Sequence, residues 1–418
     1  MRKKRFHAAL LAGAITAFGL CGCGNGDAKL QEEVSGEFEQ TDKGGVVSLT
    51  LWGAEEDAKL LDELVEGFKS SYSQQTFEIT VEYQGESNCK NALFGRLTDG
   101  PDVFTFADDQ LRVMVAAGVL APVKDAGAVR ENNVEAACEA ASVNGVLYAY
   151  PMTADNGYFL YYNKAYLGEE DIGTMDDILR VAKANGKKFV MDWSSGWYLY
   201  SFFGETGLTV GLSGDGVSNA CNWNALDTEI TGMDVARGML AIAGSGALKA
   251  SGVFADEVKN GTAIAGVSGV WDSNLVAETW GENYGAAKLP TYTCGGKQVQ
   301  MSSFAGYKMV GVNAYSKYGE WAQKLADYIT NEESQTLRFV QRGQGPSNIK
   351  ASSREEIATS PAIKAILAQS EFSSLQSIGG SYWTPAQEFG ELMAAGNPEG
   401  RSLQDILDEL VKGITSLY

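Results

Sequence analysis

The sequence is nearly devoid of histidine: its 418 residues contain one, His7. Because His7 lies in a segment that we interpret as a removed leader, we expect the mature chain to contain no imidazole. This excludes His-assisted serine or cysteine catalysis and His-ligated zinc or iron. The chain also lacks the motif GxxxxGK[ST], since neither Gly186-Lys187 nor Gly296-Lys297 is followed by Ser or Thr. A P-loop ATPase is therefore excluded.

Basic residues are also scarce. The chain has 33 Lys and Arg against 53 Asp and Glu, and a net charge of -20, with no basic stripe after its first residues. Nucleic acid is therefore not an expected partner. Gly211, Gly214 and Gly216 lack the spacing of a dinucleotide-binding loop, and we interpret them as an ordinary flexible loop. Hydrophobic residues at 44% and charged residues at 21% indicate a folded chain of two or three domains.

The first residues have the pattern of a secretory signal peptide. Four cations at positions 2–5 precede an uncharged apolar run over residues 8–20 that is too short to span a bilayer. The run ends in Leu20-Cys21-Gly22-Cys23, which resembles a bacterial lipobox. We expect residues 1–22 to be removed, Cys23 to carry the lipid, and residues 23–45 to form a flexible tether. An ordinary signal peptide with unmodified cysteines is the alternative.

Cysteine pairs with metal-binding spacing are absent. Cys89, Cys138, Cys221 and Cys294 remain after removal of the leader, with no C-x-x-C pair and no accompanying histidine. No metal or cofactor is therefore expected. Outside the cytoplasm these cysteines could form one or two disulfides, or remain buried free thiols, and the spacing leaves both open.

The order of predicted elements favours an α/β fold. A β-branched run over residues 46–51, an alternating run over 77–83 and a third run over 103–106 predict strands, with helical periodicity over 60–68, 88–97 and 109–117. This β-α-β-α-β order favours a parallel sheet, in which ligands gather at the carboxyl ends of the strands. The loops over 52–57 and 107–109 are expected at that edge.

A second α/β series follows. Asn144-Gly145 predicts a hairpin turn before residues 147–151, and the aromatic run over 158–163 predicts a strand. Thr174 and Asp177 have the spacing of a helix cap. Further strands are expected over 188–191 and 262–267, with Trp271 just past the latter. The C-terminal third has mainly helical periodicity.

Two acidic pairs follow predicted strands, Glu55-Glu56 and Asp108-Asp109. They could serve as a glycosidase pair, a calcium site, hydroxyl acceptors for a ligand, or solvated helix starts. The sequence also contains 8 Trp and 18 Tyr, whose rings suit either a core or a groove that stacks on sugar rings. Carboxylates with aromatic platforms are what a carbohydrate site needs.

Six segments in order and spacing resemble the maltose and maltodextrin binding proteins of bacterial ABC importers, across residues 46–413. They are Leu49-Thr-Leu-Trp-Gly-Ala-Glu-Glu-Asp57, Gly100-Pro-Asp-Val-Phe-Thr-Phe-Ala-Asp-Asp109, Asn144-Gly-Val-Leu-Tyr-Ala-Tyr-Pro151, Tyr161-Tyr-Asn-Lys164, Ser268-Gly-Val-Trp271 and Gly285-Ala-Ala-Lys-Leu-Pro290. The resemblance implies two α/β lobes that close on a ligand about a hinge. The first lobe would comprise residues 46–154 and 308–345, and the second residues 155–307 and 346–418. Chain crossings would fall near 154–156, 304–309 and 343–346.

The resemblance also implies a set of ligand-binding residues. In the first lobe these are Glu55, Glu56, Phe106, Asp108 and Asp109, and at the first crossing Asp155 with Asn156 as its rival. In the second lobe the aromatic platforms would be Tyr198, Trp271 and Trp383, with Trp193 and Trp197 as further stacking candidates. The sequence departs from the family pattern where Glu56 replaces a Lys, Phe106 a Trp and Gln110 an Arg.

The resemblance predicts a non-catalytic, monomeric binding protein, anchored by lipid to a cell surface of the Gram-positive type. It would capture maltose or maltodextrin and deliver it to the permease subunits of the importer. Another oligosaccharide, a sugar phosphate or a polyamine is the alternative cargo. The shortage of Arg argues against a phosphate, whereas acids and aromatics would also suit a polyamine. A surface glycoside hydrolase or a purely adhesive protein is the alternative outside this class.

Overall fold

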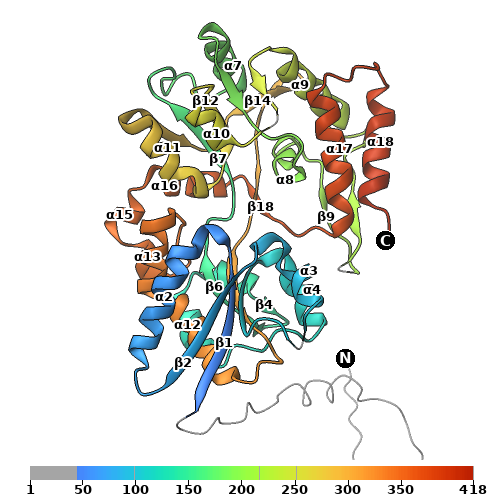
Figure 1. The fold of residues 1–418 in the computed structure, drawn as a ribbon. Helices are drawn as coiled ribbons and strands as arrows, with labels where there is room; N and C mark the ends of the chain where they lie inside the picture. Colours follow the sequence, from blue (N-terminus) through green and yellow to red (C-terminus); the bar gives the residue numbers. More distant parts are fainter. Residues whose placement is uncertain (1–44, 98, 216, 251, 418) are drawn as a thin grey trace, which may run out of the picture. The chain divides into compact units, whose positions relative to one another are not determined.

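The computed structural model describes residues 45–97, 99–215, 217–250 and 252–417, which form mixed α/β structure around two separate five-stranded sheets (Figure 1). The predicted leader and Cys23 lie outside the described residues. None of the helices in the described part has the length and hydropathy needed to cross a membrane.

The first sheet has the strand order β2-β1-β3-β17-β6. Its strands are β1 (Val46–Gly53), β2 (Thr76–Tyr83), β3 (Val103–Ala107), β6 (Ala149–Thr153) and β17 (Lys308–Val312). β1 is parallel to β2 and β3, but β17 is antiparallel to both β3 and β6. The predicted parallel arrangement is confirmed for β1, β2 and β3. The sheet as a whole is mixed, because β17, about 200 residues further along the chain, pairs antiparallel with β3 and β6.

Helices accompany this sheet before and after β17. They are α2 (Ala58–Ser71), α3 (Cys89–Phe94), α4 (Leu111–Ala116), α5 (Ala126–Asn132), α6 (Glu135–Ala140), α12 (Gly319–Ile329) and α13 (Glu332–Arg342). α2 buries Leu60, Leu61, Leu64, Val65 and Phe68 at the predicted helical spacing. Phe68 meets Tyr328 of α12 edge-on with ring centroids 5.7 Å apart. Apolar periodicity thus places α2 beside α12.

The predicted turn at Asn144-Gly145 is confirmed. It joins the short antiparallel strands β4 (Ser142–Val143) and β5 (Val146–Leu147). Both turn residues have positive φ, 52° at Asn144 and 81° at Gly145. Asn and Gly tolerate this conformation, which the two-residue turn of a tight hairpin requires.

The second sheet has the order β11-β8-β12-β7-β13. Its strands are β7 (Phe159–Asn163), β8 (Lys188–Val190), β11 (Leu248–Lys249), β12 (Ala263–Ser268) and β13 (Tyr284–Ala287). The helices around it are α7 (Met175–Ala184), α8 (Gly196–Leu199), α9 (Gly232–Gly244), α10 (Phe254–Lys259), α11 (Ser273–Trp280), α15 (Glu355–Ala358), α16 (Pro361–Ser370), α17 (Trp383–Ala394) and α18 (Leu403–Ile414). The short helix α14 (Ile349–Ser352) packs against α13 and α15. The predicted cap of α7 is present, since Thr174 Oγ1 accepts from Asp177 N at 3.1 Å.

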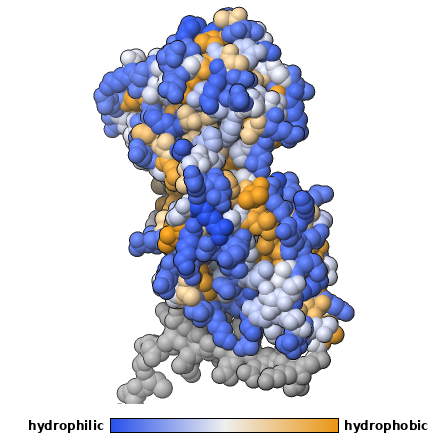
Figure 2. Space-filling view, turned by 90° about the vertical axis from the view of Figure 1, so that its left-hand side faces the viewer, coloured by the Kyte–Doolittle hydropathy of each residue, from blue (hydrophilic) through white to orange (hydrophobic). Residues whose placement is uncertain are grey.

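Short paired strands complete the second half. They are β9 (Val210–Leu212) with β10 (Asn219–Cys221), β14 (Thr291–Cys294) with β15 (Lys297–Gln300), and β16 (Ser303–Ala305) with β18 (Ser373–Leu375). Two hydrophobic clusters pack around the second sheet, one of which extends to α17 and α18. On the face of the molecule in Figure 2, hydrophobic side chains form patches among hydrophilic ones.

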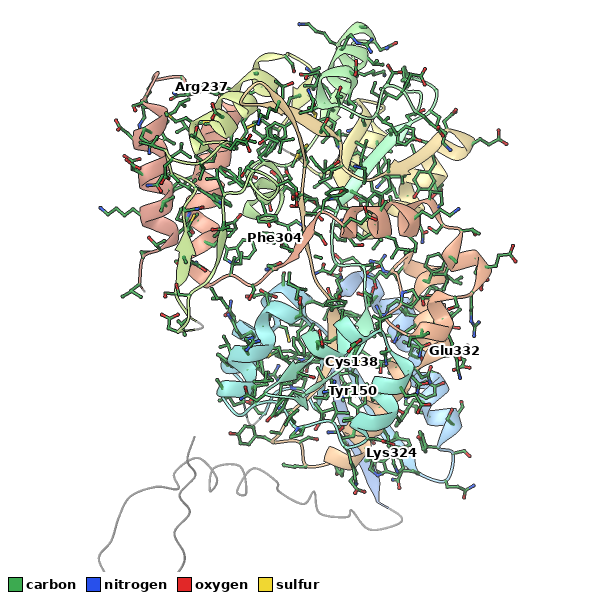
Figure 3. All side chains as sticks on the ribbon, turned by 180° about the vertical axis from the view of Figure 1, so that it is seen from behind. Cys138, Tyr150, Arg237, Phe304, Lys324 and Glu332 are labelled. Carbon is green, nitrogen blue, oxygen red and sulfur yellow. The ribbon has the colours of Figure 1, made fainter. Side chains whose placement is uncertain are left out.

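The chain passes between the two sheets at three places. It leaves the first sheet after β6 and enters the second at β7, and it returns between β16 and β17. Before the second of these passages, Phe304 stacks on Tyr200 with ring centroids 4.1 Å apart (Figure 3). The third passage follows α13, where Gly343 ends the helix with φ 70°.

Candidate functional site

Two predicted acidic loops lie at one edge of the first sheet. Glu55 and Glu56 occupy the 3-10 helix η1 (Glu55–Asp57) directly after β1, and both are exposed. Asp108 and Asp109 open the 3-10 helix η3 (Asp108–Gln110) directly after β3. Because β1 and β3 pair in parallel, their carboxyl ends meet at the same edge. The structure therefore brings the two acidic loops to one edge, as predicted.

Asp108 lies close to the crossing segments. Its Oδ1 accepts a hydrogen bond from Tyr307 N at 3.2 Å, and its own N–H donates to Tyr307 O at 3.0 Å. Burial raises the pKa of Asp108 to about 7, and the neighbouring charge of Asp109 adds to that rise. The carboxyl is therefore partly protonated near neutral pH, when it can donate as well as accept hydrogen bonds.

Asp109 differs from Asp108 because its side chain is exposed. Although part of the residue meets solvent, its carboxyl group lies among protein atoms, and this partial loss of water raises the pKa of Asp109 to about 6; Lys90 acts in the opposite direction. At neutral pH it remains mostly ionised and suits the role of a hydroxyl acceptor.

Asn156, and not Asp155, lies beside Asp108. A Cβ atom on Gly306 would lie 2.7 Å from Asp108 Oδ1 and 3.1 Å from Asn156 Nδ2, so the absence of a side chain at Gly306 permits this close approach. Asp155 is 3% exposed and accepts a hydrogen bond from the backbone N–H of Gly345. Burial raises the pKa of Asp155 to about 6. Of the two rivals, Asn156 is the better placed to act together with Asp108.

A cavity of about 260 Å³ lies at these crossings. Its lining includes Asp155, Asn156 and Tyr307, together with residues of α16 and β18. Polar atoms of the first two crossings therefore border a space that small molecules or water can enter.

Two predicted aromatic platforms are buried. Phe106 is 0% exposed, and its ring lies 5.7 Å from that of Phe104 and against Gly311 of the neighbouring strand. Trp193 is also 0% exposed and meets Phe202 edge-on at 5.2 Å. Both rings are held in a hydrophobic core, so in this structure neither offers a face to a ligand. We therefore leave Phe106 and Trp193 out of the proposed site.

The other predicted aromatics are only partly buried, and three of them come together around α8. Trp197 and Tyr198 lie on α8, with ring centroids 5.6 and 5.0 Å from that of Tyr158. Trp383, at the start of α17, packs near Gly196, where a Cβ atom would lie 3.4 Å from the indole. These rings are anchored at one end and accessible in part, as a stacking platform requires.

Trp271 follows β12, at the end of a strand of the second sheet. Its indole lies directly against Gly269, where a Cβ atom would come within 2.1 Å of the ring. Ser268 links this strand end to α8: it hydrogen-bonds Tyr198 and donates to Asp272 Oδ2 at 2.6 Å. Burial raises the pKa of Tyr198, so its hydroxyl stays protonated and available as a donor.

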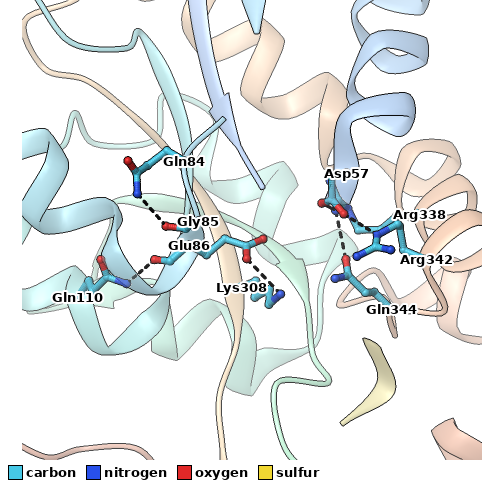
Figure 4. Close-up of polar contacts among 9 residues, drawn as sticks. All are labelled: Asp57, Gln84, Gly85, Glu86, Gln110, Lys308, Arg338, Arg342 and Gln344. Carbon is cyan, nitrogen blue, oxygen red and sulfur yellow. Dashed lines mark hydrogen bonds and ion pairs between the residues drawn. The ribbon is translucent and has the colours of Figure 1, made fainter. Parts of the chain in front are cut away.

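Sequence reasoning missed a largely buried ion pair at the first sheet. Lys308 Nζ lies 3.3 Å from Glu86 Oε2, with side-chain exposures of 16% and 11% (Figure 4). The second carboxylate oxygen, Glu86 Oε1, is buried and has no hydrogen-bond partner among the described residues. Glu86 follows β2, so the strand-end argument used for β1 and β3 would have found it.

Gln110, the departure from the family's Arg, has a structural role. It is 3% exposed, its Nε2 donates to Glu86 O at 2.7 Å, and its Oε1 accepts from Lys90 N at 2.8 Å. Gln110 thereby fixes the loop that carries Glu86. No group of three or more His, Cys, Asp or Glu suited to a metal ion occurs among the residues described.

Comparisons with known proteins agree with this architecture. The model of the bacterial extracellular solute-binding protein family matches residues 63–365. The galactooligosaccharide-binding protein of Bacillus subtilis is 26% identical, over 96% of this chain and 95% of that protein. A maltooligosaccharide ABC transporter solute-binding lipoprotein of Streptococcus pneumoniae is 24% identical, over 86% and 89%.

The solved structure of maltodextrin binding protein MalE1 from L. casei without ligand superposes with a TM-score of 0.76 and 25% identity. The match covers 90% of this chain and 100% of that one. A maltose/maltodextrin-binding domain of Bdellovibrio bacteriovorus, at 18% identity and a TM-score of 0.73, shares the fold. The chain therefore belongs to the bacterial extracellular solute-binding protein family and has its two-lobe fold.

Proposed function

We propose that the protein captures an oligosaccharide of the maltose or maltodextrin type outside the cell and delivers it to the permease of an ABC importer. The observation that carries the proposal is the placement of polar and aromatic groups. Acids occupy the strand ends of the first sheet, whereas partly exposed aromatic rings surround α8 and a strand end of the second. Carboxylates accept hydrogen bonds from sugar hydroxyls, and aromatic faces stack on the CH faces of the ring.

The proposed site comprises Glu55, Glu56, Asp108, Asp109, Asn156, Trp197, Tyr198, Trp271 and Trp383. In this proposal the lobes have the limits given above, 46–154 with 308–345 and 155–307 with 346–418. Closure about the crossings would place both sets of groups on one ligand. The protein would have no catalytic activity, and an affinity of the order of micromolar, about -8 kcal/mol, would suit capture followed by release. Cys23 would carry the lipid anchor.

A galactose-containing oligosaccharide is the second candidate cargo. The Bacillus subtilis relative, matched over nearly the whole chain, is named for galactooligosaccharides. Acids and aromatic platforms suit either sugar, because both present hydroxyl donors and apolar ring faces.

Tryptophan fluorescence titration of the mature chain tests the proposal. The ligands are maltotriose, maltohexaose, a galactooligosaccharide, spermidine and glycerol phosphate. We expect saturation with a glucan at micromolar concentration, weakened at least tenfold by Trp271→Ala or Trp383→Ala. The control is Trp321→Phe, since Trp321 lies on α12 beside the first sheet and packs on Phe77 of β2 with ring centroids 5.0 Å apart. Saturation with galactooligosaccharide alone would select the second candidate, and saturation with spermidine alone would refute both.

A further inference from the structure

A buried ion-pair cluster joins the first acidic loop to the end of α13. Arg338 Nη1 donates to Asp57 Oδ2, and Arg342 Nε donates to Asp57 Oδ1 at 2.7 Å (Figure 4). Asp57 is 2% exposed and Arg338 1% exposed, although the two residues lie 281 positions apart in sequence. Burial acts to raise the pKa of Asp57, but the two guanidinium groups outweigh it and hold the pKa below its usual value.

Asp57 is the third residue of η1, so its anchoring fixes the helical turn that presents Glu55 and Glu56. The two glutamates are exposed, whereas Asp57 points into the protein. A ligand that binds the glutamates would therefore contact a helical turn whose one buried side chain, Asp57, is hydrogen-bonded to α13.

The other end of the cluster reaches the crossing segments. Arg338 Nη1 also donates to Gln344 Oε1 at 3.1 Å. The next residue, Gly345, donates its N–H to the Asp155 carboxylate, and its carbonyl accepts from Ala154 N at 3.0 Å. A continuous set of contacts thus runs from the acidic loop, through Arg338, to the third crossing and then to the first.

Stability alone gives little reason to keep such a cluster. A buried ion pair loses so much hydration that hydrophobic residues of similar volume are often equally stable. Arg338 carries a further penalty, because its Nε and Nη2 are buried without a hydrogen-bond partner among the described residues. What the cluster supplies, and an apolar contact would not, is a fixed geometry between η1 and Gln344.

We infer that Asp57 is a positioning residue that couples ligand contact at Glu55 and Glu56 to movement at the crossings. This inference rests on the proposed function for the identity of its ligand. The contacts that couple η1 to the crossings are present without a ligand. Removing the carboxylate charge would free η1 from Gln344, so the glutamates would no longer be held in one arrangement when the lobes close. Affinity should then fall although Asp57 contacts no ligand.

The experiment compares Asp57→Asn with Glu257→Gln. Glu257 of α10 is 8% exposed and pairs with Lys249 of β11, so its variant also removes a buried carboxylate charge, but at the second sheet, whereas η1 follows a strand of the first. Because Asp57→Asn leaves Arg338 uncompensated, Asp57→Asn with Arg338→Met is made as well, which removes both charges. Each chain is titrated with maltotriose and with the galactooligosaccharide, and hydrogen exchange is measured without ligand.

We expect Asp57→Asn and the double variant to lower oligosaccharide affinity at least tenfold, and Glu257→Gln to change it less than twofold. Without ligand, amides of both 54–58 and 343–346 should exchange several-fold faster in the two Asp57 variants only. Unchanged exchange at 343–346 would overturn the inference, whatever the ligand. If exchange rises at both segments but the unmodified protein binds neither sugar, the coupling stands and the proposed function fails. If Asp57→Asn and the double variant bind the oligosaccharide within twofold of the unmodified protein, Asp57 has a purely structural role and the inference is overturned.

Discussion

Replacing Asp108 by Asn should stabilise the protein at pH 8 and leave its stability at pH 4 nearly unchanged. The folded chain raises the pKa of Asp108 from 3.8 to about 7, so between these values the folded state binds more protons than the unfolded state. The free energy of unfolding therefore falls as pH rises from about 4 to about 7. A shift of about three pKa units corresponds to roughly 4 kcal/mol when the group is fully ionised.

Asn is the suitable replacement because its amide oxygen can still accept from Tyr307 N, as Asp108 Oδ1 does at 3.2 Å. Residual contact with water reduces the expected gain at pH 8 to about 2 to 4 kcal/mol. Urea unfolding at intervals from pH 4 to pH 8 measures it, with the exposed Asp227→Asn as control. If the difference in the free energy of unfolding between Asp108→Asn and the unmodified protein stays constant from pH 4 to pH 8, the argument from burial is refuted. Because Asp108 belongs to the proposed site, we also expect the gain in stability to be accompanied by weaker sugar binding.

Three further predictions concern stability. Asn219→Ala should lower the free energy of unfolding by about 2 to 4 kcal/mol, because the buried amide makes four hydrogen bonds, to Gly379, Ser381 and Ile414; a loss under 0.5 kcal/mol in urea unfolding would contradict this. Gly343→Ala should lower the melting temperature, since φ is 70° and a Cβ atom would lie 2.3 Å from Ser273 Oγ; an unchanged value would refute it. The four described cysteines are free thiols, three of them buried, so dithiothreitol should leave the melting temperature unchanged, and Ellman's reagent should react fully only after unfolding.

The free thiols resolve one alternative that the sequence left open. Spacing alone allowed one or two disulfides, because sequence positions say nothing about which sulfur atoms approach each other. Burial raises the pKa of Cys89 to about 12 and also raises that of Cys138, which lies in the first half of the chain (Figure 3). Both thiols therefore stay protonated and react slowly.

Local patterns in the sequence determined most of the elements of the first half. The alternation over 77–83, the helical spacing of α2 and the Asn144-Gly145 turn each depend on neighbouring residues, so each could be predicted without the fold. The acids at strand ends could be predicted for the same reason: parallel strands bring their carboxyl ends to one edge, wherever the rest of the chain lies.

Only the tertiary structure decided which side chains face outward and which distant groups meet. Phe106 is buried because β17, which begins at residue 308, pairs with β3, and no local sequence pattern predicts that neighbour. Asp155 turns toward Gly345, and Asp57 toward Arg338, for the same reason: their partners lie 190 and 281 residues away. Sequence periodicity reports the environment of a residue within a few turns of chain, whereas burial and ion pairing depend on contacts that only folding creates.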